Sequence, residues 1–262
     1  MVWIDSLVGA EDLVPSVDLT REGAVAVVTL NAPGWANALV PEMAAELIHV
    51  VDEIDADPAI GAAIIRGAGD NFCSGAHRDV LAKVGQDPAE PTRYGMTGAV
   101  YEAFYRVGQL GVPSIAAVRG AAVGAGMNLA LSTDLRIVAT DARLTAGFMR
   151  IGIHPGGGFF VIGDRTMRRE ATAALGLFGE VIDGTRAERI GLAWRAVPSD
   201  EVETTAMELA AVAAKDPELA RRTVRSFRQE LGPPTVSWDV ALEAERASQM
   251  WSLRRRAAAG DT

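Results

Sequence analysis

Strand-type and helix-type patterns alternate along residues 24–198, and this alternation limits the fold more than any other feature. A valine-rich run at residues 24–30 is typical of a buried strand. Pro41 then favours the first position of a helix, which Asp57 and Pro58 are expected to end. Such alternation predicts an α/β fold in which helices are layered on a sheet. The same reading predicts strands at 60–66, 114–118 and 135–139, and helices at 76–84, 97–110 and 124–132.

The pattern changes after Pro198, where only helix-type periodicity remains. We therefore predict an α/β core over residues 1–198 and a helical C-terminal region over residues 199–262. Of the 262 residues, 49% are hydrophobic, which is enough to bury a large core.

Two glycine-rich stretches lie about fifty residues apart, at 71–76 and 120–126. Because glycine and alanine leave the backbone uncovered, each stretch can bring an N–H group against a ligand. Two such N–H groups that converge on one oxygen would stabilise an enolate or another oxyanion. The stretches therefore predict a pocket for a polarised oxygen more firmly than they predict a reaction.

Composition and missing motifs exclude several classes of protein. The net charge of −9 argues against a nucleic-acid-binding surface, which is normally basic. Neither the dinucleotide fingerprint G-x-G-x-x-G nor the phosphate loop G-x-x-x-x-G-K-[ST] occurs, so a nucleotide-binding oxidoreductase is not indicated. The serine-hydrolase pattern G-x-S-x-G is also absent.

The remaining chemistry-bearing residues point to a protein of the reducing cytoplasm. The single cysteine, Cys73, excludes an internal disulfide, and we interpret it as a buried small apolar residue. The histidines at 49, 77 and 154 lack metal-ligand spacing, so no metal site is expected. The first residues do not have the pattern of a secretory signal. The longest small-apolar run, residues 114–132, contains Arg119 and several glycines and is a poor membrane span.

Four segments in order resemble the crotonase family, that is, the enoyl-CoA hydratase/isomerase proteins. They are residues 25–31 with 37–39, residues 64–67 with 72–76, residues 113–126 with 129, 130 and 134, and residues 152–158. The resemblance implies a spiral of ββα turns with a helical C-terminal part, and a homotrimer or a homohexamer made of two trimers. It implies a lyase or isomerase of fatty acid metabolism that takes a coenzyme A thioester and has no permanently bound cofactor.

The resemblance also assigns roles to residues. It implies that the N–H groups of Ala76 and Ala125 form an oxyanion hole, with Ala125 at the start of a small-residue helix. Coenzyme A would lie along a set of small residues, with Gly124 and Phe148 also lining the substrate site. That set is Ala36, Ala38, Ser74 and Ala76.

The chain departs from the family where two catalytic glutamates are expected. Asn128 and Phe148 occupy those positions. An asparagine does not take up a proton near neutral pH, and phenylalanine has no polar atom. Ordinary hydration is therefore doubtful, and isomerisation, decarboxylation, C–C cleavage and hydrolysis stay open.

Two hypotheses follow. In one, the protein is an enzyme that uses Asn128 or His77, with Arg150 and His154 as further polar candidates. In the other, it is a non-catalytic acyl-CoA-binding protein. His77 follows Ala76 at an expected helix start, where it either acts as a base or only caps the helix. The arginines at 221, 222, 225 and 228 recur at helical spacing, which is typical of a solvated face and would also suit a ligand phosphate.

Overall fold

A computed structural model describes residues 16–230, 238–258 and 260 of the chain. Its main sheet has six strands in the order β1-β2-β3-β4-β6-β8, in which β1 is antiparallel to β2 and the other neighbours are parallel. The strands are β1 (Ser16–Glu22), β2 (Val25–Asn31), β3 (Ala62–Gly67), β4 (Ser114–Val118), β6 (Leu135–Ala139) and β8 (Arg195–Val197).

A smaller parallel sheet pairs β5 (Ala121–Val123) with β7 (Arg143–Thr145). Cys73 adds a parallel bridge to Ala122, so the segment after β3 joins this second layer. Short 3-10 turns lie at η1 (Pro33–Trp35), η2 (Phe148–Ile151) and η3 (Ser199–Glu201).

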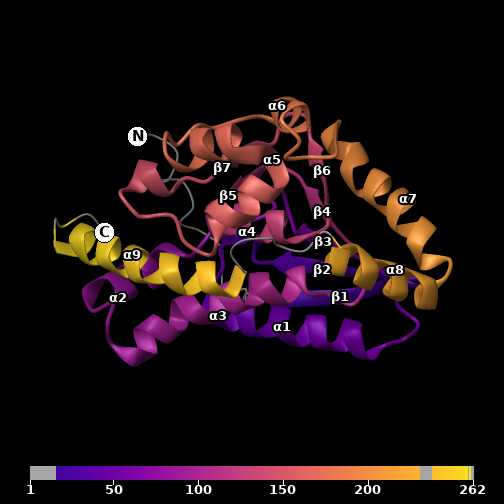
Figure 1. The fold of residues 1–262 in the computed structure, drawn as a ribbon, viewed down its shortest axis with the longest axis horizontal. Helices are drawn as coiled ribbons and strands as arrows, with labels where there is room; N and C mark the ends of the chain where they lie inside the picture. Colours follow the sequence, from indigo (N-terminus) through magenta and orange to yellow (C-terminus); the bar gives the residue numbers. More distant parts are fainter. Residues whose placement is uncertain (1–15, 231–237, 259, 261–262) are drawn as a thin grey trace.

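Helices cover both faces of the main sheet (Figure 1). On one side α1 packs against β1, β2 and α3, and on the other α7 packs against β2, β3, β4 and β6. The helix α9 runs along α2 and also contacts α3 and α5. Strand β4 is buried along its whole length, as expected of a parallel strand covered on both faces. The helices are α1 (Pro41–Ala56), α2 (Arg78–Gln86), α3 (Pro91–Gly108), α4 (Ala125–Ser132), α5 (Phe159–Gly176), α6 (Gly184–Arg189), α7 (Val202–Ala214), α8 (Pro217–Glu230) and α9 (Trp238–Ala258).

The predicted fold class is confirmed: helices surround a mainly parallel sheet, and the described residues after 198 form helices and no strand. The split into regions at residue 198 stays a prediction. The described C-terminal helices pack on the core, since α7 lies on the sheet and α9 lies on α2.

Several predicted boundaries differ from those of the structure. Strand β3, for example, begins at Ala62 rather than at residue 60. The sequence pattern does not mark β1, because only Val17 of this strand is buried. Helix α3 begins at Pro91 rather than at Thr97, because the Glu90 carboxylate accepts hydrogen bonds from the first free N–H groups of the helix. These bonds lower the pKa of Glu90. Helix α2 begins at Arg78 rather than at residue 76.

Candidate functional site

The two glycine-rich stretches lie side by side and are hydrogen-bonded to each other. The Cys73 N–H donates to the Ala121 carbonyl at 3.0 Å, and the Val123 N–H donates to the Cys73 carbonyl at 3.0 Å. Their approach requires glycine: a Cβ added at Gly126 would lie 2.1 Å from the Cys73 carbonyl oxygen. A Cβ at Gly75 would lie 2.8 Å from the Val123 oxygen, and φ at Gly75 is +104°. Sequence segments fifty residues apart thus form one backbone surface.

The N–H groups of Ala76 and Ala125 have no partner among the described residues. Ala76 pairs with Leu39 on one side: the Leu39 N–H donates to the Gly75 carbonyl, and the His77 N–H donates to the Leu39 carbonyl. In this parallel pairing the N–H of Ala76 itself faces away from Leu39. Ala125 is the first residue of α4, where an N–H lacks an intrahelical partner. A Cβ at Gly75 would lie 3.5 Å from the Ala125 nitrogen, so the two stretches meet at this point.

The loop that precedes α1 borders the same edge. The Ser74 N–H donates to the Ala36 carbonyl at 2.9 Å, and the Ser74 hydroxyl donates to the Trp35 carbonyl at 3.2 Å. Ala36 and Asn37 both have positive φ, 49° and 55°, which is strained for residues other than glycine. Ala38 is buried beside them. Three of the residues predicted to line a coenzyme A site therefore lie on one loop and its neighbour.

The Asn37 side chain holds this strained loop. Its Oδ1 accepts from the Ala32 N–H at 2.9 Å, and its Nδ2 donates to the carbonyls of Ala68 and Asn71 at 2.9 and 2.7 Å. The side chain is fully buried, with three backbone partners from two segments. In the sequence, Asn37 stands out only as part of the 37–39 motif. An asparagine three residues after the Pro33-Gly34 pair, in a loop, is the signal that could have marked it as a loop clamp.

Asn128 lies one turn after Ala125 on α4 and is fully buried. Its Nδ2 donates to the Gly156 carbonyl at 2.7 Å, which ties α4 to the glycine turn at residues 156–158. Its Oδ1 is buried and has no partner among the described residues. The Asn128 Nδ2 therefore supports the glycine turn, while Oδ1 is an acceptor without a partner among the described residues.

Phe148 lies in η2, against the start of α4. Its ring meets the Phe159 ring edge-on, with centroids 6.2 Å apart. A Cβ added at Gly124, the residue that caps α4, would lie 4.0 Å from an edge atom of the Phe148 ring. An apolar ring thus borders the N-terminus of the helix that presents the Ala125 N–H.

Comparison with known proteins gives the family. The sequence profile of enoyl-CoA hydratase/isomerase matches residues 20–250. The chain belongs to the enoyl-CoA hydratase/isomerase family. It is 40% identical over 219 residues to the probable enoyl-CoA hydratase EchA14 of Mycobacterium tuberculosis, covering 83% of each chain.

Solved structures agree with this membership. A structure of Pseudomonas aeruginosa PA4980 is 32% identical, with a TM-score of 0.75 over 90% of this chain and 99% of that one. An enoyl-CoA hydratase from Bacillus halodurans has a TM-score of 0.82 at 20% identity, over 93% of this chain and 99% of that one, and supports the fold alone.

Within this family member, the other polar candidates lie elsewhere or are engaged. The His77 Nδ1 accepts the Asp79 N–H at 3.3 Å and caps α2, and its ring lies 4.8 Å from the Trp35 ring. The Arg150 guanidinium donates to the Gly179 carbonyl. The His154 Nδ1 lies 2.7 Å from the Pro155 carbonyl oxygen. The structure therefore joins Ala76, Ala125, Asn128 and Phe148 around one helix start and turns His77 toward its own helix.

The thiol beneath the site is structural. Cys73 is buried, and burial raises the pKa of its thiol to about 12. A thiol with such a pKa is neutral and unreactive at physiological pH. Among the residues that the structure describes, no group of His, Cys, Asp or Glu is arranged to hold a metal ion. No helix in the described ranges is long and apolar enough to cross a membrane.

Proposed function

We propose that this protein binds an acyl-CoA thioester and stabilises the enolate form of its acyl group. The observation that carries the proposal is the pair of unpartnered N–H groups at Ala76 and Ala125, on two stretches that meet at the start of α4. A thioester oxygen placed between them would accept both hydrogen bonds. The positive end of α4 would add to this stabilisation as negative charge develops on the oxygen. No resident cofactor is needed for this chemistry.

Ordinary hydration is not the reaction we propose, although the Mycobacterium relative is named as a probable hydratase. Adding water to an enoyl thioester needs groups that take up and deliver a proton, each contributing typically ~10²–10⁴ to the rate. Asn128 is bound to the Gly156 carbonyl, and Phe148 is packed on Phe159. Isomerisation, decarboxylation, C–C cleavage or hydrolysis of a thioester stays open, because each can pass through an oxyanion.

A substitution at Ala125 tests the oxyanion hole. Proline is well tolerated at the first position of a helix and lacks the N–H, so Ala125→Pro removes the donor and keeps a helix start. Ala125→Gly is the matched control, since it keeps the donor. Calorimetry with acetyl-CoA should show a loss of about tenfold or more for the proline variant and little change for the glycine variant. Equal binding of acetyl-CoA and free CoA by the wild type would contradict the proposal.

A non-catalytic acyl-CoA binder is the second candidate, favoured by the absence of a titratable side chain at positions 128 and 148. A screen of enoyl, β-keto-acyl and malonyl-type thioesters separates the two functions. Turnover of any of them by the wild type, lost in Ala125→Pro, supports the enzyme. Tight binding with no turnover supports the binder. Crotonyl-CoA hydration within about tenfold of an ordinary hydratase would contradict the expected loss. Glutamates at both positions 128 and 148 should raise that rate if the double variant folds.

We also propose the family's assembly, a homotrimer or a pair of trimers. Light scattering on the purified protein should give three or six times the mass of the chain, and a monomeric mass would contradict this.

A further inference from the structure

The four arginines of α8 divide into two pairs with different surroundings. The Arg221 guanidinium donates to four backbone carbonyls, those of Ile54 and Asp57 at 2.8 and 2.7 Å and those of Asp55 and Ile60 at 3.3 and 3.2 Å. It therefore caps the C-terminal end of α1.

Arg228 is engaged in a similar way on the same face of α8. It pairs with the Asp134 carboxylate at 2.9 Å and donates to the Leu110 carbonyl. Arg221 and Arg228 are two helical turns apart, and both tie α8 to the core. They are structural residues.

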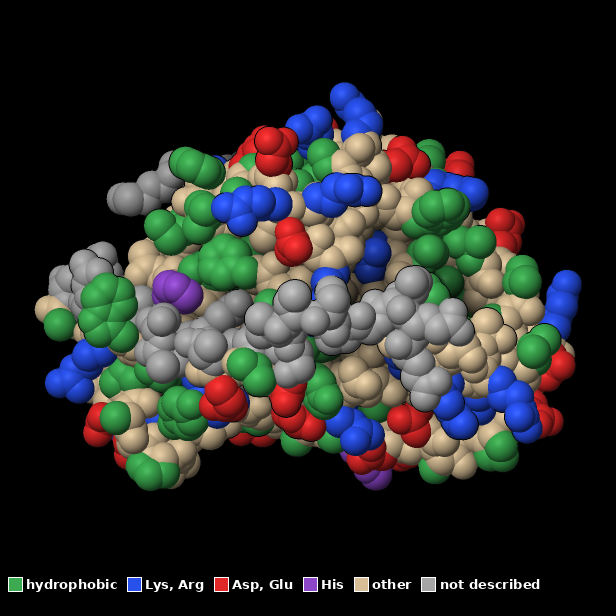
Figure 2. All heavy atoms as spheres, viewed as in Figure 1, with side chains coloured by type: hydrophobic (Ala, Val, Ile, Leu, Met, Phe, Trp, Pro, Cys, Tyr) green, Lys and Arg blue, Asp and Glu red, His purple; other side chains and the backbone are tan. Residues whose placement is uncertain are grey.

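Arg222 and Arg225 have no such bonds to the core within residues 16–230 and 238–258. Among the described residues, Arg222 pairs only with Glu218, one turn earlier on α8, and both side chains are about three-quarters exposed. Arg225 has no hydrogen-bond or ion-pair partner in the described part of the chain. On the face shown in Figure 2, basic side chains gather at the lower right, over the end where Figure 1 places α8.

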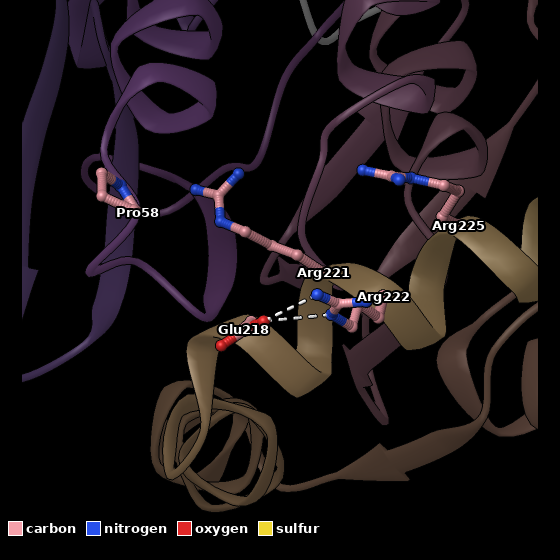
Figure 3. A pocket seen from close by; sticks show the side chains of 5 residues that line it. All are labelled: Pro58, Glu218, Arg221, Arg222 and Arg225. Atoms are coloured by element: carbon pink, nitrogen blue, oxygen red, sulfur yellow. Dashed lines mark hydrogen bonds and ion pairs between the residues drawn. The ribbon is translucent and has the colours of Figure 1, made fainter.

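A cavity of about 530 Å³ lies here, lined by Pro58, Glu218, Arg221, Arg222 and Arg225. Figure 3 shows Arg221 and Arg225 extending from α8 toward the segment that carries Pro58, while Arg222 turns to Glu218. The volume is within the range of small-molecule sites. Three guanidinium groups and one carboxylate leave the cavity with an excess of positive charge, in a chain whose net charge is −9.

The cavity is remote from the proposed acyl-CoA site. Pro58 precedes β3, whereas Ala76 follows it, so the two sites lie at opposite edges of the parallel sheet. A six-residue strand spans about 20 Å. Figure 1 likewise shows α8 at one end of the molecule and α2 at the other.

We propose that this cavity binds a small phosphate-bearing anion, with Arg225 and Arg222 as its ligands and Arg221 as a fixed neighbouring charge. The planar guanidinium fork matches phosphate oxygens. A phosphate carries close to two negative charges near neutral pH, which matches an excess of two guanidinium groups better than one carboxylate does. Binding would release Arg222 from Glu218, an exposed pair that contributes little by itself.

Inorganic pyrophosphate is the probe that tests this proposal. Calorimetry at low salt should show saturable binding to the wild type, weakened about tenfold or more in Arg225→Gln. Arg169→Gln is the matched control, because Arg169 is an equally exposed arginine on α5. Binding should also weaken as salt is raised. No saturable binding, or an equal loss in both variants, would overturn the proposal. Citrate binding as tight as pyrophosphate binding would also overturn it, since that marks an unselective basic patch.

Acetyl-CoA separates this site from the acyl-CoA site, because coenzyme A itself carries phosphates. We expect Arg225→Gln to bind acetyl-CoA as the wild type does, and Ala125→Pro to bind pyrophosphate as the wild type does. If Arg225→Gln loses both ligands, the arginines hold the phosphates of coenzyme A, and the proposal of a separate site is wrong. If only acetyl-CoA binding fails in the wild type, the proposed acyl-CoA function is wrong and the arginine site stands.

Discussion

The two edges of the parallel sheet, at the amino and carboxyl ends of its strands, differ in the hydrogen-bond donors that they present. At the carboxyl edge, the 71–76 and 120–126 stretches present backbone N–H groups, with side chains that are small or apolar. At the amino edge, α8 presents guanidinium groups on long side chains around Pro58. Backbone donors are fixed by the fold and carry no full charge. They suit a neutral thioester oxygen that becomes negative, whereas flexible arginines suit an anion that is charged from the start.

The two edges should also differ in the substitutions that they tolerate. A backbone site depends on the close contact of two segments, so a single added methyl group is enough to separate them. A side-chain site on a helix surface can lose its charge with little change in folding. Four sets of substitutions test this difference between the two edges.

Gly126→Ala should have the largest effect on folding. The added Cβ would lie 2.1 Å from the Cys73 carbonyl oxygen, a backbone atom that can move only with its strand. We expect the free energy of unfolding to fall by about 3 kcal/mol or more. Gly95→Ala is the control. Gly95 lies within α3 with open space around its Cβ position, so this change should stabilise by up to ~1 kcal/mol. Chemical denaturation measures both. A Gly126→Ala protein as stable as the wild type would show that the two stretches are not in tight contact.

Arg221→Ala and Arg225→Ala should differ, although both remove one arginine from the same helix. Loss of Arg221 leaves four carbonyls at the end of α1 without their donor, which should cost about 2 kcal/mol of unfolding free energy. Loss of the exposed Arg225 should change it by less than about 0.5 kcal/mol. Equal effects would contradict the division of α8 into structural and ligand-binding arginines.

Cys73 should make the free energy of unfolding depend on pH at high pH. Burial raises its pKa from 9.0 to about 12, so the folded state holds the thiol neutral. This contribution to stability is complete below pH 9 and is lost as pH rises through the range up to about 12. At pH 10 the wild type should have lost about 1 kcal/mol more than Cys73→Ala, relative to each protein at pH 7. Denaturation curves at both pH values provide the measurement. Parallel behaviour of the two proteins would show that the thiol is not buried.

The sequence predicts the frame of the carboxyl edge but not its details. Valine-, isoleucine- and alanine-rich runs identify β2, β3, β4 and β6, because parallel strands covered on both faces are mainly apolar. Small residues at 71–76 and 120–126 indicate that two backbones approach. The short strands β5 and β7 escape prediction, since three residues have no period and are set by their partner. The hydrogen bonds of Asn37 are hard to predict for a similar reason. Two of its three partners, the carbonyls of Ala68 and Asn71, come close to Asn37 only in the folded protein.

The amino edge was harder to predict. The spacing of the arginines in α8 places Arg221 and Arg228 on one face, but it does not tell a solvated face from one that meets free carbonyls. That distinction depends on where α1 ends, which is a property of the tertiary structure. His77 shows the same limit, because a histidine at a helix start is compatible with both a base and a cap.

His77→Ala should have a small effect on folding and little on ligand binding. Its Nδ1 accepts the Asp79 N–H, a bond of 3.3 Å at the start of the nine-residue helix α2, and its ring lies beside Trp35. Loss of an N-cap at an exposed position costs about 0.5–1 kcal/mol, and His77→Asn should recover it, because asparagine is a strong N-cap residue. Turnover of any thioester that the wild type processes should stay within about threefold in both variants, since a residue that only caps α2 does not affect the rate.

A catalytic base would give the opposite result. Turnover would fall about a hundredfold in both His77→Ala and His77→Asn, with acetyl-CoA binding retained, because neither residue can take up the proton. Paired measurements of unfolding free energy and turnover on these two variants therefore decide whether the carboxyl edge works through its backbone alone or with a histidine beside it.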